Sequence, residues 1–112
     1  MSNSDTIVAL ATPQGVGAIG VIRLSGSDAI AIADKVFKGK KLAEQVSHTL
    51  HYGHIMDGEK VIDEVMISLF RAPKSFTTED VVEISIHGSP FIAEQISALL
   101  VKHGARTAKP GV

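Results

Sequence analysis

The alternation of hydrophobic and polar residues along this 112-residue chain predicts a mixture of strands and helices. Runs rich in β-branched and other apolar residues favour extended chain, and here they are bounded by turn-forming residues. We therefore expect strands at residues 6–11, 18–24, 49–56, 61–70 and 80–86. In the last run, the alternation puts Val82, Ile84 and Ile86 on one face of the strand and Glu83 on the other.

Two other segments repeat apolar residues every three or four positions, which predicts helices with one buried face. Ser25 or Ser27 can cap the first helix. Ser89 and Pro90 suit the start of the second helix, and Gly104 suits its end. The predicted buried residues of the first helix are Ala29, Ile32, Ala33, Val36 and Phe37. Those of the second are Ile92, Ile96, Leu99, Leu100 and His103.

A hairpin and a short final strand complete the predicted fold. Asp57-Gly58 lies between two strand-like runs, which is a strong hairpin signal. Residues 106–109 are expected to form an edge strand after the second helix. Strands and helices do not alternate regularly in this order. We therefore predict one α+β domain over residues 1–112, with a mixed β-sheet and two or three helices.

Residues 15–20, Gly-Val-Gly-Ala-Ile-Gly, match the fingerprint of dinucleotide-binding loops. That fingerprint needs a helix that opens at its last glycines, whereas the following Val-Ile-Arg-Leu favours a second strand. A dinucleotide site is therefore disfavoured. Two interpretations stay open: a tight turn with a packing glycine, or a loop in which Gly15, Gly17 and Gly20 shape space for a flat ligand.

Two lone charges stand out in the predicted strands. Arg23 is the only charge in residues 18–24, and Glu83 is the only charge in the stretch VVEISIHG. Glu83 can face solvent on a half-exposed strand, or it can accept charge-assisted hydrogen bonds from the donor-rich edge of a ring. The two residues can also form an ion pair, if their strands lie side by side.

Composition narrows the classes of function. The formal net charge is −1, so no overall basic field holds nucleic acid by phosphate contacts alone. The chain has no cysteine, which excludes disulfides, thiolate zinc sites and cysteine nucleophiles. The sequence has no P-loop motif and no pattern that supports a Ser-His-Asp triad, so we predict no catalytic residue in this chain. The N-terminus is not a signal peptide and no apolar run could span a bilayer, so we expect a soluble, cytoplasmic protein.

Other polar clusters have simpler interpretations. His48, His51 and His54 are spaced by three, which on a strand puts consecutive histidines on opposite faces, so we predict no metal site. Residues 87–90 join a strand to a helix N-terminus; a capped connection is favoured there over an anion site. Four acids are expected to be solvated: Asp63, Glu64, Glu79 and Asp80.

Several blocks, in the same order, closely resemble the N-terminal domain of the tRNA-modification GTPase family MnmE, also called TrmE. The blocks are DTIVALATPQGVGAIGVIRLSG, VIDEV, APKSFTTEDVVEISIHGSP and GARTAKPG, and the match extends over almost the whole chain. Thr78 and Ser89 stand where the family usually has glycine, which concerns the local shape of two loops. The family continues beyond the Pro-Gly pair at residues 110–111, so we expect this chain to be the first domain of a longer protein.

The resemblance implies a fold similar to the folate-binding domain of aminomethyltransferases. Such a domain binds a tetrahydrofolate derivative, in its 5-formyl or methylene form, and makes the homodimer of its protein. By position, Arg23 and Glu83 match the family's folate-contacting arginine and glutamate. Glu83 can accept from the pterin edge, and Arg23 can complement a ring carbonyl or the anionic tail. Gly15 and Gly17 would then shape the entry to the pocket, with Gly20 leaving room beside the ligand.

The resemblance also implies the activity of the whole protein. A helical domain and a GTP-binding domain would follow, and the latter would hold GTP, magnesium and potassium. With the flavin protein MnmG, the family modifies C5 of the wobble uridine in certain tRNAs, and no membrane is involved. These 112 residues alone are then expected to be non-catalytic. A purely structural dimerisation module without a working folate site remains the alternative.

Overall fold

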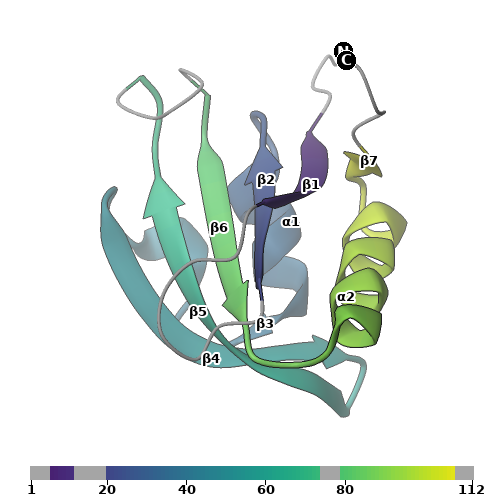
Figure 1. Ribbon diagram of the computed structural model, residues 1–112. Helices are drawn as coiled ribbons and strands as arrows, with labels where there is room; N and C mark the ends of the chain where they lie inside the picture. Colours follow the sequence, from purple (N-terminus) through teal and green to yellow (C-terminus); the bar gives the residue numbers. More distant parts are fainter. Residues whose placement is uncertain (1–5, 12–19, 74–78, 108–112) are drawn as a thin grey trace.

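In a computed structural model, the described part of the chain forms one seven-stranded sheet with two helices (Figure 1). The structure describes residues 6–11, 20–73 and 79–107. The strand order is β3-β4-β5-β6-β2-β1-β7. Among these strands only β1 and β7 pair in parallel, and the other neighbours are antiparallel. The sheet is therefore mixed, which confirms the predicted α+β class.

The predicted strands are present, with ends that differ by a few residues. Residues 18, 19, 108 and 109, which belong to predicted strands, lie outside the described residues. The strands are β1 (Ile7–Ala11), β2 (Gly20–Ser25), β3 (Phe37–Lys38), β4 (Thr49–Asp57), β5 (Lys60–Phe70), β6 (Val81–Ile86) and β7 (Arg106–Thr107). The helices are α1 (Ala29–Val36) and α2 (Pro90–Lys102), with a 3₁₀ turn at Leu42–Glu44.

The local signals for the hairpin and for α2 are confirmed. The β4–β5 turn contains Gly58, whose φ of 62° is one that glycine adopts easily. The Ser89 side chain accepts a hydrogen bond from the Ile92 amide, and Pro90 occupies the first turn of α2. Gly104, with φ of 124°, follows the last turn.

The predicted cap of α1 is wrong, because the chain makes a turn before the helix begins. Gly26 has φ of 148°, and a Cβ added there would lie 2.7 Å from the Thr6 Cα. The Thr6 hydroxyl then accepts a hydrogen bond from the Asp28 amide at 3.1 Å. Ser25 is the last residue of β2 and Ser27 lies in the turn, so Asp28 becomes the N-cap residue, without a side-chain cap bond.

Phe37 is buried as predicted, but in a strand and not in α1. It has extended backbone angles and pairs with Ile55 in β3. Its ring passes over Gly53, where an added Cβ would lie 2.5 Å from the Phe37 Cζ. The missing side chain at Gly53 thus lets the chain turn onto the β4 edge directly after the helix.

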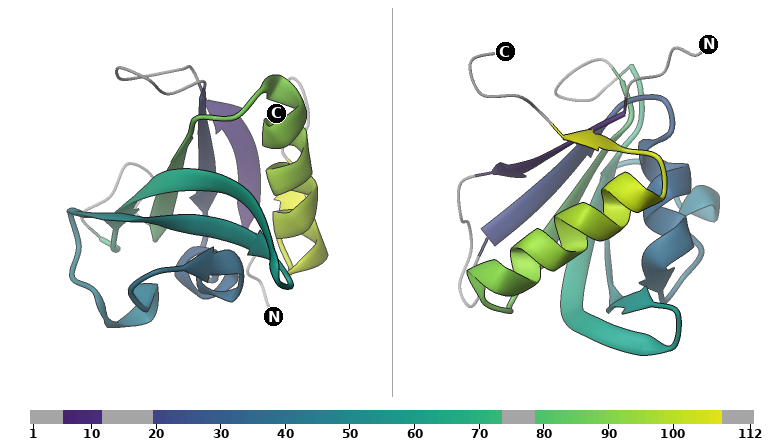
Figure 2. Two further views of the ribbon diagram at one scale, coloured as in Figure 1. Left: turned by 90° about the horizontal axis from the view of Figure 1, so that it is seen from below. Right: turned by 90° about the vertical axis from the view of Figure 1, so that its right-hand side faces the viewer.

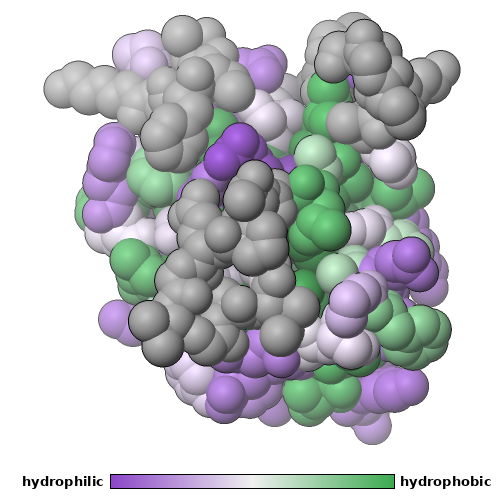
Figure 3. All heavy atoms as spheres, viewed as in Figure 1, coloured by the Kyte–Doolittle hydropathy of each residue, from purple (hydrophilic) through white to green (hydrophobic). Residues whose placement is uncertain are grey.

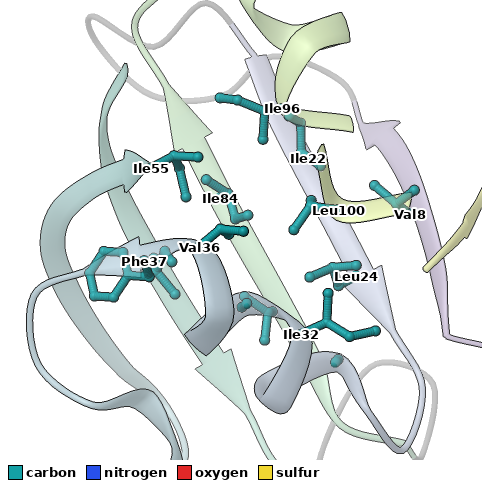
Figure 4. Close-up of a cluster of buried hydrophobic side chains, with 14 of the residues drawn as sticks. Val8, Ile22, Leu24, Ile32, Val36, Phe37, Ile55, Ile84, Ile96 and Leu100 are labelled. Carbon is teal, nitrogen blue, oxygen red and sulfur yellow. The ribbon is translucent and has the colours of Figure 1, made fainter. Parts of the chain in front are cut away.

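Both helices pack on one face of the curved sheet (Figure 2). Alternating residues of the central strands face them, so Ile22 and Leu24 of β2 and Ile84 of β6 lie in the core. Figure 4 shows these side chains meeting Val36 of α1 and Leu100 of α2. The alternate residues of the same strands must therefore lie on the opposite face, which neither described helix covers.

Candidate functional site

The sheet face opposite the helices, here called the second face, carries the two charges singled out in the sequence. Five neighbouring strands contribute one residue each to a continuous row across its centre, because each pair lies directly opposite in the strand register. The row consists of Ala9, Arg23, Glu83, Ser68 and Leu50. The sequence predicted which residues alternate, and the strand order brings them into one line.

Arg23 and Glu83 form an ion pair in this row. The guanidinium donates to one carboxylate oxygen of Glu83, Oε2, from Nη2 at 2.7 Å and from Nε at 2.9 Å. The Glu83 side chain is only 13% exposed and that of Arg23 is 37% exposed. Of the alternatives left open by the sequence, the ion pair is therefore confirmed, and the interpretation of Glu83 as a solvent-facing residue is wrong.

The carboxylate of Glu83 keeps accepting capacity beyond this ion pair. Both of its hydrogen bonds with Arg23 end on Oε2. Within the described residues, Oε1 accepts none, and the hydroxyl of the neighbouring Ser68 makes none either. A half-buried carboxylate oxygen is a strong acceptor for a ligand N–H, since such a bond gains strength away from bulk water.

The β4 side of the second face is apolar. Leu50 is 64% exposed and Tyr52 is 56% exposed, and both lie on β4. Met66 and Phe70 of β5 are half-buried on the same face. Figure 3 shows one side of the molecule. Among the described residues on this side, hydrophobic side chains are exposed next to hydrophilic ones. Such a surface suits contact with a partner better than a wholly charged surface would.

Tyr52 also donates a hydrogen bond to Glu64, which is therefore not simply solvated as predicted. This bond, more than partial burial or the charge of Glu64, raises the pKa of the Tyr52 phenol. The ring of His54 contacts Tyr52 edge-on, with centroids 5.7 Å apart. Tyr52 thus stays a neutral hydrogen-bond donor across the physiological pH range.

Of the three predicted pocket-shaping glycines, the structure describes only Gly20. Gly15 and Gly17 lie outside the described residues. Gly20 begins β2 and alternates with Arg23, so it faces the helix side, where an added Cβ would lie 3.4 Å from Leu10 Cδ1. This position gives no support to a role for Gly20 beside a ligand at Glu83. A strand at this glycine also contradicts the helix that a dinucleotide fingerprint needs.

The connection at residues 87–90 is a capped turn, as the sequence favoured. Its amides at His87 and Gly88 both donate to Asp63 Oδ2, at 2.9 and 3.0 Å. The carboxylate of Asp63 thus takes the place that an external anion would occupy before α2. The expectation that Asp63 is merely solvated is wrong, because β5 carries it alongside the end of β6.

The three histidines of the 48–54 region have separate surroundings. His48 hydrogen-bonds with Ser47 and contacts the Phe70 ring, whereas His51 hydrogen-bonds with Thr49. In the described part of the chain, no three His, Asp or Glu side chains come together as metal ligands. None of the described helices is both long and apolar enough to cross a bilayer.

Two charged residues that no sequence pattern indicated, Asp34 and Arg71, hold the 3₁₀ turn in place through hydrogen bonds. The Asp34 carboxylate accepts from the amides of Leu42 and Ala43, which holds the 3₁₀ turn against α1. The Arg71 guanidinium donates to the carbonyl oxygen of Ala43 within this turn, at 3.0 Å, and to that of Gln45 directly after it, at 2.7 Å. No short-range pattern marks these residues, because the partners of Asp34 lie eight and nine residues away and those of Arg71 lie 26 and 28 residues away.

Comparison with known proteins gives consistent matches. Residues 6–112 match the family model described as the GTP-binding protein TrmE N-terminus. The chain is 60% identical over 107 residues to a "tRNA modification GTPase MnmE" of Streptococcus thermophilus, covering 96% of this chain. Proteins of the same name from Cytophaga hutchinsonii and Lactococcus lactis subsp. cremoris are 56% and 55% identical, over 98% and 96% of the chain. In each case the match covers 24% of the relative, so the chain spans about a quarter of the length of these proteins.

Proposed function

Because the chain belongs to the family of the GTP-binding protein TrmE N-terminus, we propose that it binds a tetrahydrofolate derivative and forms a homodimer. It does so as the N-terminal domain of a tRNA-modifying GTPase. The fold is then that of the folate-binding domain of aminomethyltransferases. The ligand is the 5-formyl or methylene form, and Arg23 and Glu83 contact it.

The observation that carries the folate site is the accepting capacity of Glu83. Its carboxylate is 13% exposed, and one of its oxygens accepts no hydrogen bond from the described residues. A pterin edge presents an amino group beside a ring N–H, and this pair of donors fits a carboxylate. Arg23 holds the other oxygen at 2.7 Å, which fixes the carboxylate before a ligand arrives.

The homodimer is supported by the apolar part of the second face. Leu50 and Tyr52 are more than half exposed on β4, a strand near the edge of the sheet. A second copy that covers these side chains removes apolar surface from water on both protomers. The central row, which ends at Leu50, then enters the dimer interface, with Glu83 two strands away from Leu50.

The activity of the longer protein is part of the proposal. The matched relatives are each named a tRNA modification GTPase. In that protein, GTP with magnesium and potassium binds in a separate domain, and MnmG is the partner in modifying C5 of the wobble uridine. The reaction takes place in the cytoplasm, and the present residues contribute folate binding and dimerisation.

Calorimetric titration of the chain with 5-formyltetrahydrofolate tests the folate site. We expect saturable binding with one ligand per protomer, and competition by methylenetetrahydrofolate. NAD, titrated in the same way, is the control and should give no heat of binding. A protein that melts cooperatively yet gives no folate signal would contradict the folate site and leave the structural dimerisation module.

Light scattering at tens of micromolar protein tests the dimer. We expect twice the mass of the 112-residue, 11.8 kDa chain, because the apolar part of the second face needs cover. Leu50→Glu should shift the mass toward the monomer, since it places a charge in the interface. Glu59→Gln, a change in the β4–β5 turn, is the control and should leave the mass unchanged. A wild-type chain that stays monomeric at this concentration would contradict a dimer built by these residues.

A further inference from the structure

The central row of the second face continues past the ion pair to Ser68. Ser68 of β5 lies directly opposite Glu83 in the register, and Arg23 lies opposite Glu83 on the other side. Residues in such opposed positions have Cβ atoms about 4.5–5.5 Å apart. Arg23, Glu83 and Ser68 therefore form a line of three polar side chains, with the carboxylate in the middle.

The hydroxyl of Ser68 has capacity for a ligand. Ser68 is half-buried, and within the described residues its hydroxyl makes no hydrogen bond. Its neighbour on the far side is Leu50, which offers no polar atom from its side chain. A hydroxyl can donate one hydrogen bond and also accept, so Ser68 is free to donate to an oxygen held above the row.

The order of polar groups in this line matches one edge of a particular ring. A 2-amino-4-oxo pteridine presents, in sequence, a ring nitrogen that accepts, an amino group and an N–H that donate, and a carbonyl oxygen that accepts. Arg23 donates, Glu83 accepts with Oε1 as its open oxygen and Ser68 can donate, so the order of these groups is complementary to that of the ring edge. The carbonyl oxygen then comes to the side of Glu83 that faces Ser68.

We propose that the Ser68 hydroxyl donates a hydrogen bond to the ring carbonyl of a bound 2-amino-4-oxo pteridine whose amino group and N–H bind Glu83. This inference rests on the proposed folate site and adds an orientation and a contact residue to it. Arg23 then meets the pterin end of the ligand and not its anionic tail.

Ser85 provides a matched comparison on the same face. It lies two residues along β6 from Glu83, roughly 6.6 Å away along the strand. Its register partners are Val21 and Met66, so it belongs to the next row and not to the polar line. A ligand aligned with Arg23, Glu83 and Ser68 should make no required hydrogen bond with Ser85.

The test compares Ser68→Thr with Ser68→Val by calorimetric titration with 5-formyltetrahydrofolate. The two variants have nearly the same shape and differ in the hydroxyl. We expect Ser68→Thr to bind within about threefold of the wild type, and Ser68→Val to bind about 3- to 10-fold more weakly than Ser68→Thr. Ser85→Ala should bind within about twofold of the wild type.

The outcomes separate this inference from the function on which it rests. Equal affinities for Ser68→Thr and Ser68→Val, with a wild-type chain that binds folate, would overturn the Ser68 contact and leave the folate site standing. A loss in Ser85→Ala as large as that in Ser68→Val would overturn the alignment along the row. A wild-type chain that binds no folate would remove both. Thermal melting of each variant, with Ser68→Ala as a smaller substitute, shows that the losses come from binding and not from unfolding.

Discussion

Replacing Glu83 by glutamine is expected to weaken the binding of 5-formyltetrahydrofolate by about 30- to 700-fold. The substitution removes the negative charge and turns one accepting oxygen into an NH₂ group that faces another donor. Losing a charge-assisted hydrogen bond and leaving two donors opposed costs about 2–4 kcal/mol of binding free energy. Calorimetry, or competition against a labelled folate for the weakest variants, measures the dissociation constant directly.

The same substitution should change folding much less than binding. The ion pair with Arg23 is lost, but the Arg23 side chain is 37% exposed and can take up water in place of the carboxylate. Glu59→Gln in the exposed β4–β5 turn is the matched control for a lost carboxylate and should alter neither property. Unchanged folate affinity in Glu83→Gln would refute the role of Glu83. A variant that loses its cooperative melt would make Glu83 a structural partner of Arg23.

The pairing of Arg23 with Glu83 shows which features of the candidate site the sequence predicts and which it does not. Each residue is conspicuous because it interrupts an apolar strand, and the alternation of β6 puts Glu83 on the face opposite Ile84. The sequence does not contain the strand order. The pair forms because β6 lies between β5 and β2, and Arg23 of β2 is 60 residues earlier in the chain than Glu83. That choice depends on packing of the whole sheet and not on local propensity.

Asp63 and Phe37 show the opposite case. Asp63 looks like a strand-end acid. Its carboxylate nevertheless accepts hydrogen bonds from two backbone amides of the β6–α2 connection, because β5 and β6 are neighbouring strands. Phe37 continues the apolar period of α1 but leaves the helix to pair with Ile55. In both, a long-range contact decides between local options that the sequence leaves nearly equal in free energy. The caps of α2, by contrast, are satisfied within a few residues and follow from the sequence alone.

Replacing Ile84 by alanine is expected to lower the free energy of unfolding by about 3–5 kcal/mol. Ile84 is fully buried at the centre of the sheet, opposite Ile22 on one side and Ile67 on the other. Figure 4 shows it next to Val36 of α1. Alanine leaves a cavity among side chains of β2, β5 and α1, none of which can move in without losing its own contacts. For a domain of this size, whose total stability is about 5–15 kcal/mol, such a loss is a large share.

Urea unfolding at one fixed protein concentration measures this loss, since a dimer would make stability depend on concentration. Val61→Ala is the control, because Val61 is 53% exposed on β5 and also loses a β-branched side chain. It should cost less than about 1 kcal/mol, so the difference between the variants reports the cavity and not strand propensity. Ile84→Val, which removes one methylene and keeps the branch, should cost about 0.5–1.5 kcal/mol. If Ile84→Ala cost no more than Val61→Ala, the packing of both helices on this face of the sheet would be refuted, and the placement of Glu83 on the second face with it.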